Sequence, residues 1–395
     1  MRRVKLFFVL AAAFFTGVSQ PVSALDIPTE AEYALVTDFE SGLVLLEKNA
    51  DTAMKPASMA KIMTVYIAFS RIAEGSLSMD DSFIVSEKAW KMGGSRSFLN
   101  AGARYSLSDL LHGIIVQSGN DAAVVLAEGI SGTEENFAAE MNAMAAKLGM
   151  TNTRFANATG WPHPDLTTTA RDLNILASAL IRDFPADRYP QLYPMFAKRT
   201  YTINDIKQGN RNPLLYGRDA EINGADGLKT GYTDESGYGL VASAERKGQR
   251  IVMVLNGMDS KKERASESRR LMDFMFREFK KYDFFAADEV IDHADVWLGA
   301  ESHVPLTLDG KLSRVMSRTD RARTEIRVSW SNPAPAPITK GQQLGVLEIV
   351  QNDNVMETLA LRAGASVEEL GMFDRIGAAL KYLILGAPPQ QNPVQ

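Results

Sequence analysis

Three short motifs follow one another along this chain, and they can act together only if the fold brings them into one cleft. A Ser-x-x-Lys motif lies at 58–61, a Ser-Gly-Asn motif at 118–120 and a Lys-Thr-Gly motif at 229–231. The first supplies a hydroxyl and an amine, the second a polar side chain that can pass a proton, and the third a strand that can hold a carboxylate. Together the motifs predict acyl transfer through a serine ester.

Each motif by itself is weak evidence. A serine and a lysine three residues apart are common on solvated helix faces, Ser-Gly-Asn is typical of a loop, and Lys-Thr-Gly is typical of a strand before a turn. Lys61, however, is followed by an apolar run that continues to Ile72, which predicts a buried helix. Pro56 suits the start of that helix. We therefore expect Ser58 in the first turn, where unpaired backbone N–H groups help to bind an oxyanion.

Serine is a weak nucleophile at neutral pH and needs a base within hydrogen-bond reach. Lys61 can serve as this base only if its pKa falls from about 10.4 to about 7. Such a fall requires the charged form of Lys61 to be destabilised by roughly 4 to 5 kcal/mol. Burial and a second cation have this effect, and Lys229 across the cleft is the expected cation. Ser118 is expected to bridge the two amines and to protonate the leaving group, while Asn120 holds a substrate amide.

The pattern of residues 30–282 mixes strands and helices. Strands near both ends with helices between them predict an α+β domain, whose sheet is assembled from distant segments and packs against the nucleophile helix. Ser118 is expected on a loop between two helices. The expected helices are 62–72, 107–116, 122–130, 134–148 and 261–281, and the expected strands are 33–36, 42–46, 228–232, 239–244 and 250–256.

A different pattern begins near residue 286. Residues 324–330 alternate between apolar and polar side chains, which is typical of a strand with one buried face, and turn residues separate several further short apolar runs. Residues 286–364 are therefore expected to form a small all-β domain. Its other expected strands are 296–298, 304–308, 345–350 and 356–361.

The N-terminal segment 1–24 has the pattern of a secretory signal. Basic residues precede an apolar stretch at 6–18, and small residues at 22–24 suit cleavage before Leu25. A transmembrane anchor is the alternative, but the stretch is shorter than the roughly 20 residues that span a bilayer. The chain contains no cysteine, so an exported protein of this sequence has neither disulfides nor thiolate chemistry.

Residues 365–386 predict a C-terminal amphipathic helix. Their apolar side chains recur every three or four positions, and the charged ones lie elsewhere around the helix. We expect this helix to lie on a membrane surface, while the alternative is that the same face packs on the β domain. The tail 387–395 contains prolines that cannot continue the helix.

Composition argues against two other classes of function. A formal net charge of −5 gives no reason to expect nucleic-acid binding, which requires a concentrated basic surface. The four histidines show no metal-ligand spacing, so neither a catalytic metal nor another cofactor is expected.

On these motifs the chain resembles the serine-type D-alanyl-D-alanine carboxypeptidases, the low-molecular-mass penicillin-binding proteins of the S11 peptidase type. The wider segments at 55–58, 117–122 and 227–234 are also similar to this family. The resemblance implies a β-lactamase/transpeptidase-like domain at 25–285, an antiparallel sheet with helices on both faces. The small all-β domain and the amphipathic helix would follow it.

The resemblance also implies residue roles. Ser58 would be the acylated nucleophile, Lys61 the general base and Ser118 the proton shuttle. The oxyanion hole would be formed by backbone N–H groups, which depends on backbone placement and not on side-chain identity. Family members often have histidine at the position of Tyr232, which puts a side-chain role there in doubt. The implied substrate-binding residues are Asn120, Lys229, Thr230, Gly231 and Tyr232.

By this resemblance the substrate is the D-Ala-D-Ala end of peptidoglycan pentapeptide stems, and β-lactam antibiotics acylate Ser58 covalently. The implied location is the periplasm, with peripheral attachment to the inner membrane through the C-terminal helix. Two rivals remain. A β-lactamase of the same fold commonly uses a Glu-x-x-Leu-Asn segment, and the closest string, at 170–174, has Ala170 in place of the glutamate. A non-catalytic wall-binding scaffold is the other.

Overall fold

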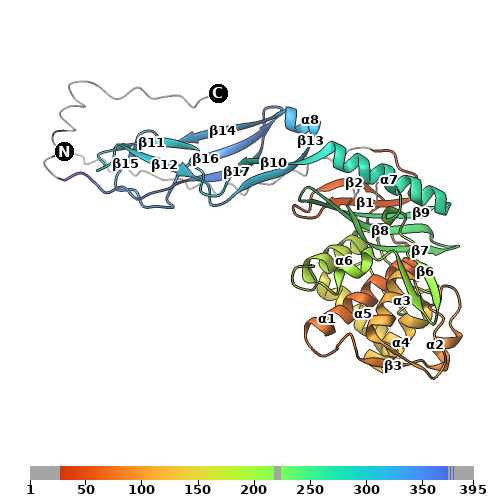
Figure 1. Ribbon diagram of the computed structural model, residues 1–395. Helices are drawn as coiled ribbons and strands as arrows, with labels where there is room; N and C mark the ends of the chain where they lie inside the picture. Colours follow the sequence, from red (N-terminus) through yellow and green to blue (C-terminus); the bar gives the residue numbers. More distant parts are fainter. Residues whose placement is uncertain (1–26, 218–223, 372–373, 375–376, 378–395) are drawn as a thin grey trace, which may run out of the picture. The chain divides into compact units, whose positions relative to one another are not determined.

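The computed structural model describes residues 27–217 and 224–371, together with Asp374 and Gly377 (Figure 1). These residues divide into two compact units, and the division along the chain falls between Lys280 and Lys281. The expected signal segment 1–24, most of the expected C-terminal helix and the tail 387–395 lie outside the described residues.

The first unit is built on a five-stranded antiparallel sheet with the order β2-β1-β9-β8-β7. β1 comes from the start of the unit and pairs with β9 from its end, as expected from strands at both ends of the pattern. β7 lies at the edge and carries the Lys-Thr-Gly motif. The strands are β1 (Tyr33–Asp38), β2 (Val44–Lys48), β7 (Ala225–Thr233), β8 (Gly237–Arg246) and β9 (Gln249–Met258).

Helices cover both faces of this sheet (Figure 1). α7 packs on β8 and β9, while α6 packs on β1 and β9 from the side where the other helices gather. α1 is buried along most of its length, as its apolar sequence predicted. The helices are α1 (Lys61–Ala73), α2 (Glu87–Lys91), α3 (Leu107–Val116), α4 (Asn120–Ser131), α5 (Glu134–Leu148), α6 (Ala170–Asp183) and α7 (Lys261–Glu278).

Local capping explains where several of these helices begin. The side chains of Ser106, Thr133, Thr169 and Ser260 each accept a hydrogen bond from the backbone N–H three residues later. Such a cap satisfies one of the N–H groups that the first turn of a helix leaves unpaired. α5 ends at Leu148 and is followed by Gly149, whose φ of 83° is readily adopted by glycine.

The expected long helices and central strands are confirmed to within a few residues, but several elements were not predicted. α6 was missed, and so were α2 and two small hairpins. α7 ends three residues before the expected end, because strand β10 (Phe279–Phe285) begins there with Phe279 buried. The hairpins are β3 (Ser82–Ile84) with β4 (Arg104–Ser106), and β5 (Thr200–Ile203) with β6 (Ile206–Gly209).

The second unit is mainly β, as expected. A six-stranded sheet has the order β14-β16-β17-β12-β11-β15, and β10 pairs separately with β13. Its core is a cluster of buried aliphatic side chains that includes Val304, Leu347 and Leu361. The elements are β11 (Asp292–Trp297), β12 (His303–Thr307), β13 (Leu312–Ser317), the short helix α8 (Arg318–Ala322), β14 (Thr324–Trp330), β15 (Ala334–Pro335), β16 (Gln343–Gln351) and β17 (Asn354–Ala363).

The expected start of the C-terminal helix at residue 365 is wrong. Val367 is only 3% exposed, belongs to the β core and forms a bridge with Ile338. Leu370 donates its N–H to the carbonyl of Leu298. Residues 365–371 are therefore an extended segment of the second unit, because burial of Val367 and long-range backbone pairing outweigh the local helical pattern.

Candidate active site

Ser58 lies in a short 3-10 turn, Ala57–Ala60, that leads directly into α1. Lys61 is the first residue of α1 and its side chain is fully buried. Its Nζ lies 3.0 Å from Ser58 Oγ, 2.7 Å from Asn120 Oδ1 and 2.6 Å from the carbonyl oxygen of Thr159. The structure therefore brings the expected nucleophile and the expected base into direct hydrogen-bond contact.

A charged lysine makes these contacts by donating to all three oxygens, and a neutral lysine can make them as well. The amide oxygen of Asn120 and the carbonyl oxygen of Thr159 can only accept hydrogen bonds, so Lys61 must donate to both. An uncharged amine has two N–H donors and one lone pair. Lys61 Nζ donates to Ser58 Oγ at 3.0 Å, and once Lys61 has lost a proton its lone pair faces this hydroxyl, which can then donate to it. In this state Lys61 is oriented to take the serine proton.

The pKa of Lys61 also favours the neutral form. It is lowered to about 7, first by burial and second by the positive charge of Arg211, against the opposing charges of Asp121 and Glu134. Sequence reasoning named Lys229 as the cation that acts on Lys61. The two amines do repel each other, because the charge of Lys61 is the first of the charges that lower the pKa of Lys229. Arg211, which lies outside all three motifs, adds a positive charge that lowers the pKa of both lysines.

Lys229 and Thr230 lie on β7 and are almost completely buried. Lys229 Nζ donates to Ser118 Oγ at 2.9 Å and to the carbonyl of Thr230 at 3.1 Å. The pKa of Lys229 is held well below its usual value by burial, and then by the positive charges of Lys61, Arg211 and Arg264. A carboxylate that enters here relieves this repulsion and restores the ammonium form.

Ser118 lies on the loop between α3 and α4, as expected, and is 2% exposed. Its φ of 61° places it in the left-handed region, which is uncommon for a residue other than glycine. The expectation that Ser118 bridges both amines holds only for Lys229. Among the described hydrogen bonds, those of Lys61 Nζ go to Ser58, Asn120 and Thr159. These three contacts occupy all the hydrogen-bonding positions of the amine.

Asn120 begins α4, and both ends of its side-chain amide are engaged. Oδ1 accepts from Lys61, and Nδ2 donates to the carbonyl of Gly93 at 2.8 Å. Asn120 was expected to orient a substrate amide. In the structure it also orients Lys61, a role that its position in the motif did not indicate.

The carbonyl of Thr159 is held by a loop that sequence reasoning missed. The side-chain oxygen of Asn157 accepts hydrogen bonds from the backbone N–H groups of Thr159, Gly160 and Trp161. An asparagine followed by a glycine three residues later is a recognisable turn signal, so the loop itself was predictable. Its contact with Lys61 was not, because 98 residues separate Lys61 from Thr159.

Two glycines allow other loops to approach the nucleophile turn closely. A Cβ on Gly160 would lie 1.8 Å from the carbonyl oxygen of Ala57, and one on Gly231 would lie 2.9 Å from that of Pro56. Gly231 was predicted as a substrate-binding residue. The structure adds that a side chain at this position would collide with the turn that carries Ser58. Ala57 itself has a φ of 47°, so the backbone next to Ser58 is in a sparsely populated conformation.

The side chain of Tyr232 makes its described contacts with neighbours on the β7–β8 hairpin. Its hydroxyl donates to Asp234 at 2.6 Å, its ring stacks on Tyr238 with centroids 4.1 Å apart, and 47% of it is exposed. The hydrogen bond to Asp234 raises the pKa of Tyr232 to about 12. This hydroxyl is therefore neutral at physiological pH.

Arg211 is held between two buried asparagines after β6. The Asn212 side chain donates to the carbonyl of Gly227 at 2.7 Å, and that of Asn210 donates to the carbonyl of Lys198 at 3.1 Å. Arg211 is exposed to solvent, and partial desolvation by the surrounding chain lowers its pKa from the usual value. No sequence motif marks this arginine, and only the fold places its charge near the two lysines.

Residues 170–174, the segment that most nearly matches Glu-x-x-Leu-Asn, have polar side chains that pack α6 against the rest of the unit. Asp172 accepts a hydrogen bond from Thr153 at 2.6 Å, and Asn174 accepts one from Thr37 on β1 at 3.1 Å. These contacts tie α6 to its neighbours. They account for the polar residues of the string without a water-activating role.

The arrangement fits one kind of chemistry. A serine hydroxyl contacts a buried amine whose pKa is lowered to about 7. A second hydroxyl accepts from a lysine on a sheet edge, and Arg211 and Arg264 add positive charge. The first pair can generate a nucleophile and the second can protonate a leaving group. The positive charge favours a substrate that ends in a carboxylate.

Sequence comparisons give consistent relatives. Residues 17–260 match the peptidase S11 family, described as D-alanyl-D-alanine carboxypeptidase, and residues 279–369 match the penicillin-binding protein 5 C-terminal domain. D-alanyl-D-alanine carboxypeptidase DacC of Escherichia coli (strain K12) is 34% identical over 378 residues, which cover 94% of this chain and 92% of the relative.

Solved structures with a similar fold carry related names. Penicillin-binding protein 5 from Haemophilus influenzae aligns with a TM-score of 0.70 and 31% identity, covering 88% of this chain and 100% of that one. Penicillin-binding protein D2 from Listeria monocytogenes, in its ampicillin-bound form, aligns with a TM-score of 0.56 and 31% identity. That alignment covers 64% of this chain and 100% of the other.

Proposed function

The chain belongs to the peptidase S11 family of D-alanyl-D-alanine carboxypeptidases, and from this premise we propose that Ser58, Lys61 and Ser118 carry out its acyl transfer. The protein is a serine-type carboxypeptidase that removes the terminal D-alanine from peptidoglycan stems, and it is a penicillin-binding protein. The observation that carries the residue assignment is the 3.0 Å contact between Ser58 Oγ and Lys61 Nζ, together with the lysine pKa of about 7.

In the first step the neutral amine of Lys61 takes the hydroxyl proton while Ser58 Oγ attacks the carbonyl carbon of the penultimate D-alanine. Backbone N–H groups of Ser58 and Tyr232 stabilise the oxyanion. The C–N bond then breaks, and the leaving nitrogen receives a proton from the hydroxyl of Ser118. Ser118 recovers a proton from Lys229, which the bound terminal carboxylate keeps in the ammonium form and whose Nζ lies 2.9 Å from the Ser118 oxygen.

Free D-alanine departs and leaves an ester on Ser58. The departing amine also takes the proton held by Lys61, so it leaves as an ammonium group and Lys61 is neutral again. Water then attacks the ester carbonyl and gives a proton to Lys61, and Lys61 passes this proton to the oxygen of Ser58 as the shortened stem is released. Lys61 is the one base in contact with Ser58 Oγ among the described hydrogen bonds, so we assign it to both half-reactions. A β-lactam enters by the same attack, and its opened ring keeps the leaving nitrogen tethered.

The terminal carboxylate of the substrate is proposed to lie against Lys229 and Thr230. Arg211 adds to this preference, because its charge already depresses the pKa of both lysines and a bound anion offsets it. The peptide bond next to that carboxylate is then the one presented to Ser58. This geometry supports removal of one terminal residue.

The activity can be tested on the unmodified protein. We expect release of D-alanine from a synthetic pentapeptide that ends in D-Ala-D-Ala, and slow turnover of benzylpenicillin after a covalent adduct forms. Fast penicillin hydrolysis without D-alanine release would indicate a β-lactamase. Absence of both the adduct and D-alanine would indicate a scaffold.

Removal of the Arg211 charge tests the electrostatic part of the proposal. An Arg211→Met variant loses a cation that lowers the pKa of Lys61, so that pKa should rise. Lys61 works as a base only when neutral, so the acylation rate should increase at higher pH than in the parent. The measurement is the pH profile of penicillin acylation. The control is Arg199→Met, because Arg199 is not among the charges that shift the pKa of Lys61. Superimposable profiles for parent and variant would contradict the assignment.

We also propose that the protein is exported and attached peripherally to the inner membrane. The signal pattern at 1–24 and the apolar spacing beyond residue 371 support this. Among the described residues no helix has the length and apolar character needed to cross a membrane. Deleting residues 372–395 and fractionating the cells tests the attachment, and unchanged recovery in the membrane fraction would contradict it.

A further inference from the structure

A buried carboxylate outside the three motifs contacts the loop of residues 157–160, which we call the Thr159 loop. Glu134, the first residue of α5, is 8% exposed. Its Oε1 accepts the backbone N–H of Ala158 at 3.2 Å, and its Oε2 lies 3.0 Å from Lys88 Nζ. A buried carboxylate is costly unless it is paired, and these two contacts pair it. The reaction steps described above make no use of this group.

The Thr159 loop connects Glu134 with the general base. The carbonyl oxygen of Thr159 accepts from Lys61 Nζ at 2.6 Å. The preceding carbonyl, that of Ala158, accepts from Thr64 Oγ1 at 2.7 Å. Lys61 and Thr64 lie one turn apart on α1, so α1 contacts two consecutive carbonyls of the loop, while Glu134 holds the loop from α5. The orientation of Lys61 therefore depends on a loop that two helices fix.

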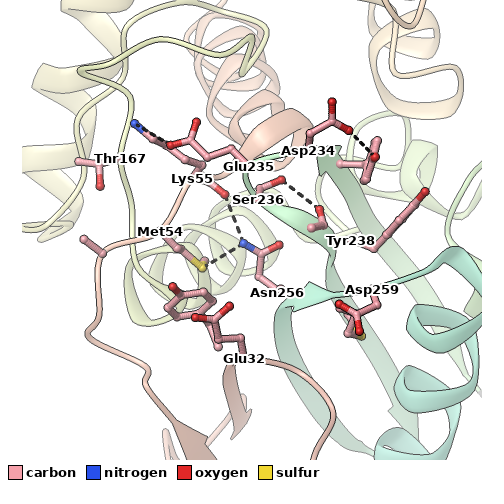
Figure 2. Close-up of a pocket in the computed structure, with 16 residues that line it drawn as sticks. Glu32, Met54, Lys55, Thr167, Asp234, Glu235, Ser236, Tyr238, Asn256 and Asp259 are labelled. Atoms are coloured by element: carbon pink, nitrogen blue, oxygen red, sulfur yellow. Dashed lines mark hydrogen bonds and ion pairs between the residues drawn. The ribbon is translucent and has the colours of Figure 1, made fainter.

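The backbone before Ser58 has a separate anchor on the sheet. Asn256 on β9 donates from Nδ2 to the carbonyl of Lys55 at 3.2 Å and to the sulfur of Met54 at 3.3 Å, as Figure 2 shows. Asn256 is 1% exposed, so this anchor is shielded from water. It does not involve Glu134. A change at Glu134 is therefore expected to affect the base more than the nucleophile.

Glu134 also acts on Lys61 through its charge. The charged groups that face Lys61 are Arg211 after β6, Asp121 on α4, Glu134 on α5 and Lys229 on β7. Burial lowers the pKa of Lys61 most, and Arg211 lowers it further. The carboxylates of Asp121 and Glu134 raise it. Removal of the Glu134 charge should therefore lower this pKa, which is the opposite of the effect expected from removing Arg211.

We propose that Glu134 is a positioning residue of the reaction, because it holds the loop that directs the amine of Lys61 toward Ser58. This inference rests on the proposed function and adds a residue to it. The described contacts of the Glu134 carboxylate reach the loop and Lys88 but not Ser58. Glu134 acts on the acylation rate through the direction of the Lys61 lone pair, and on the pH dependence through its charge. Lys88 keeps the carboxylate in place from α2.

Two substitutions separate the contact from the charge. Glu134→Gln keeps an oxygen that can accept the N–H of Ala158, whereas Glu134→Leu removes both oxygens. We expect Glu134→Leu to lower the highest rate of penicillin acylation by roughly ten- to hundredfold, because a small displacement of a catalytic group costs that much. Glu134→Gln should stay within roughly threefold of the parent. Its pH profile should lie roughly 0.3 to 1 unit lower, since a carboxylate no longer stabilises the Lys61 cation.

The matched control is Glu135→Gln. Glu135 is the next residue on α5, is largely exposed and lies 3.1 Å from the same Lys88 Nζ. It is not among the charges that shift the pKa of Lys61, and its described hydrogen bond goes to Lys88 and not to the Thr159 loop. Its acylation rate and pH profile should match those of the parent. Thermal unfolding of each variant gives the folded fraction to which the rates refer.

The outcomes distinguish this proposal from the proposed function. Equal highest rates for the parent and Glu134→Leu would overturn the positioning role and leave the carboxypeptidase intact. A Glu134→Gln profile that superimposes on the parent profile would also overturn it, and this result is available even if Glu134→Leu does not fold. So would a Glu134→Gln rate as low as that of Glu134→Leu, because the retained oxygen would then have no effect. Absence of a penicillin adduct on the parent would overturn the proposed function itself.

Discussion

Replacing Ser58 with alanine is expected to abolish covalent labelling by a fluorescent penicillin and to reduce D-alanine release to background. The proposed reaction forms an ester on Ser58 Oγ, and no other described hydroxyl contacts Lys61 Nζ. The fold should survive, because Ser58 is only half-buried and the described hydrogen bond of its side chain is the one to Lys61. Thermal unfolding of the variant should therefore stay close to that of the parent.

A matched control for Ser58→Ala is available on the same helix. Ser70 lies on α1, and its hydroxyl donates to the carbonyl of Tyr66 at 3.0 Å, away from the site. Ser70→Ala should keep full labelling. A labelled adduct on the Ser58→Ala protein, located by peptide mass, would show that another residue is the nucleophile.

Replacing Lys61 with methionine should slow acylation by roughly 10²- to 10⁴-fold, the usual contribution of a positioned general base. Methionine has a similar length but cannot accept the proton of Ser58. The parent rate should rise as the pH passes through about 7, where Lys61 becomes neutral, and the residual rate of the variant should lack this rise. The measurement is penicillin acylation from pH 5 to about 9, a span that brackets this pKa.

The Lys61→Met substitution should lower activity without lowering the stability of the fold below pH 7. Lys61 is protonated in the unfolded chain up to a pH near 10.5 but only up to about 7 in the folded protein. Its burial therefore destabilises the fold by about 4 to 5 kcal/mol below pH 7, and this penalty declines between pH 7 and 10.5. Methionine removes the penalty but leaves Asn120 Oδ1 and the Thr159 carbonyl unpaired, at about 1 to 3 kcal/mol each.

We therefore expect Lys61→Met to be at least as stable as the parent at pH 6 and relatively less stable at pH 10. Lys147→Met, at the exposed end of α5, should alter neither acylation nor this pH dependence. An acylation rate within tenfold of the parent would show that another group acts as the base. Loss of folding at pH 6 would show instead that the three contacts of Lys61 outweigh its desolvation.

Much of the fold was readable from local patterns. The helix α1 is mostly apolar and is buried from Lys61 to Phe69, and the strands β8 and β9 carry the apolar runs expected of central strands. α6 was not predicted, although Thr169 caps it and its buried side chains recur at helical spacing. The extended segment around Val367 had a helical spacing that tertiary packing overrode.

The sequence by itself determined which side chains can do the chemistry, because a hydroxyl and an amine one helical turn apart and a Lys-Thr-Gly strand depend on short-range order. The tertiary structure alone decided the state of those groups. The pKa of Lys61 depends on Arg211, and its orientation depends on Thr159 and Asn120, all distant in the chain. Desolvation and Coulomb repulsion act through space, so the spacing of motifs cannot reveal them.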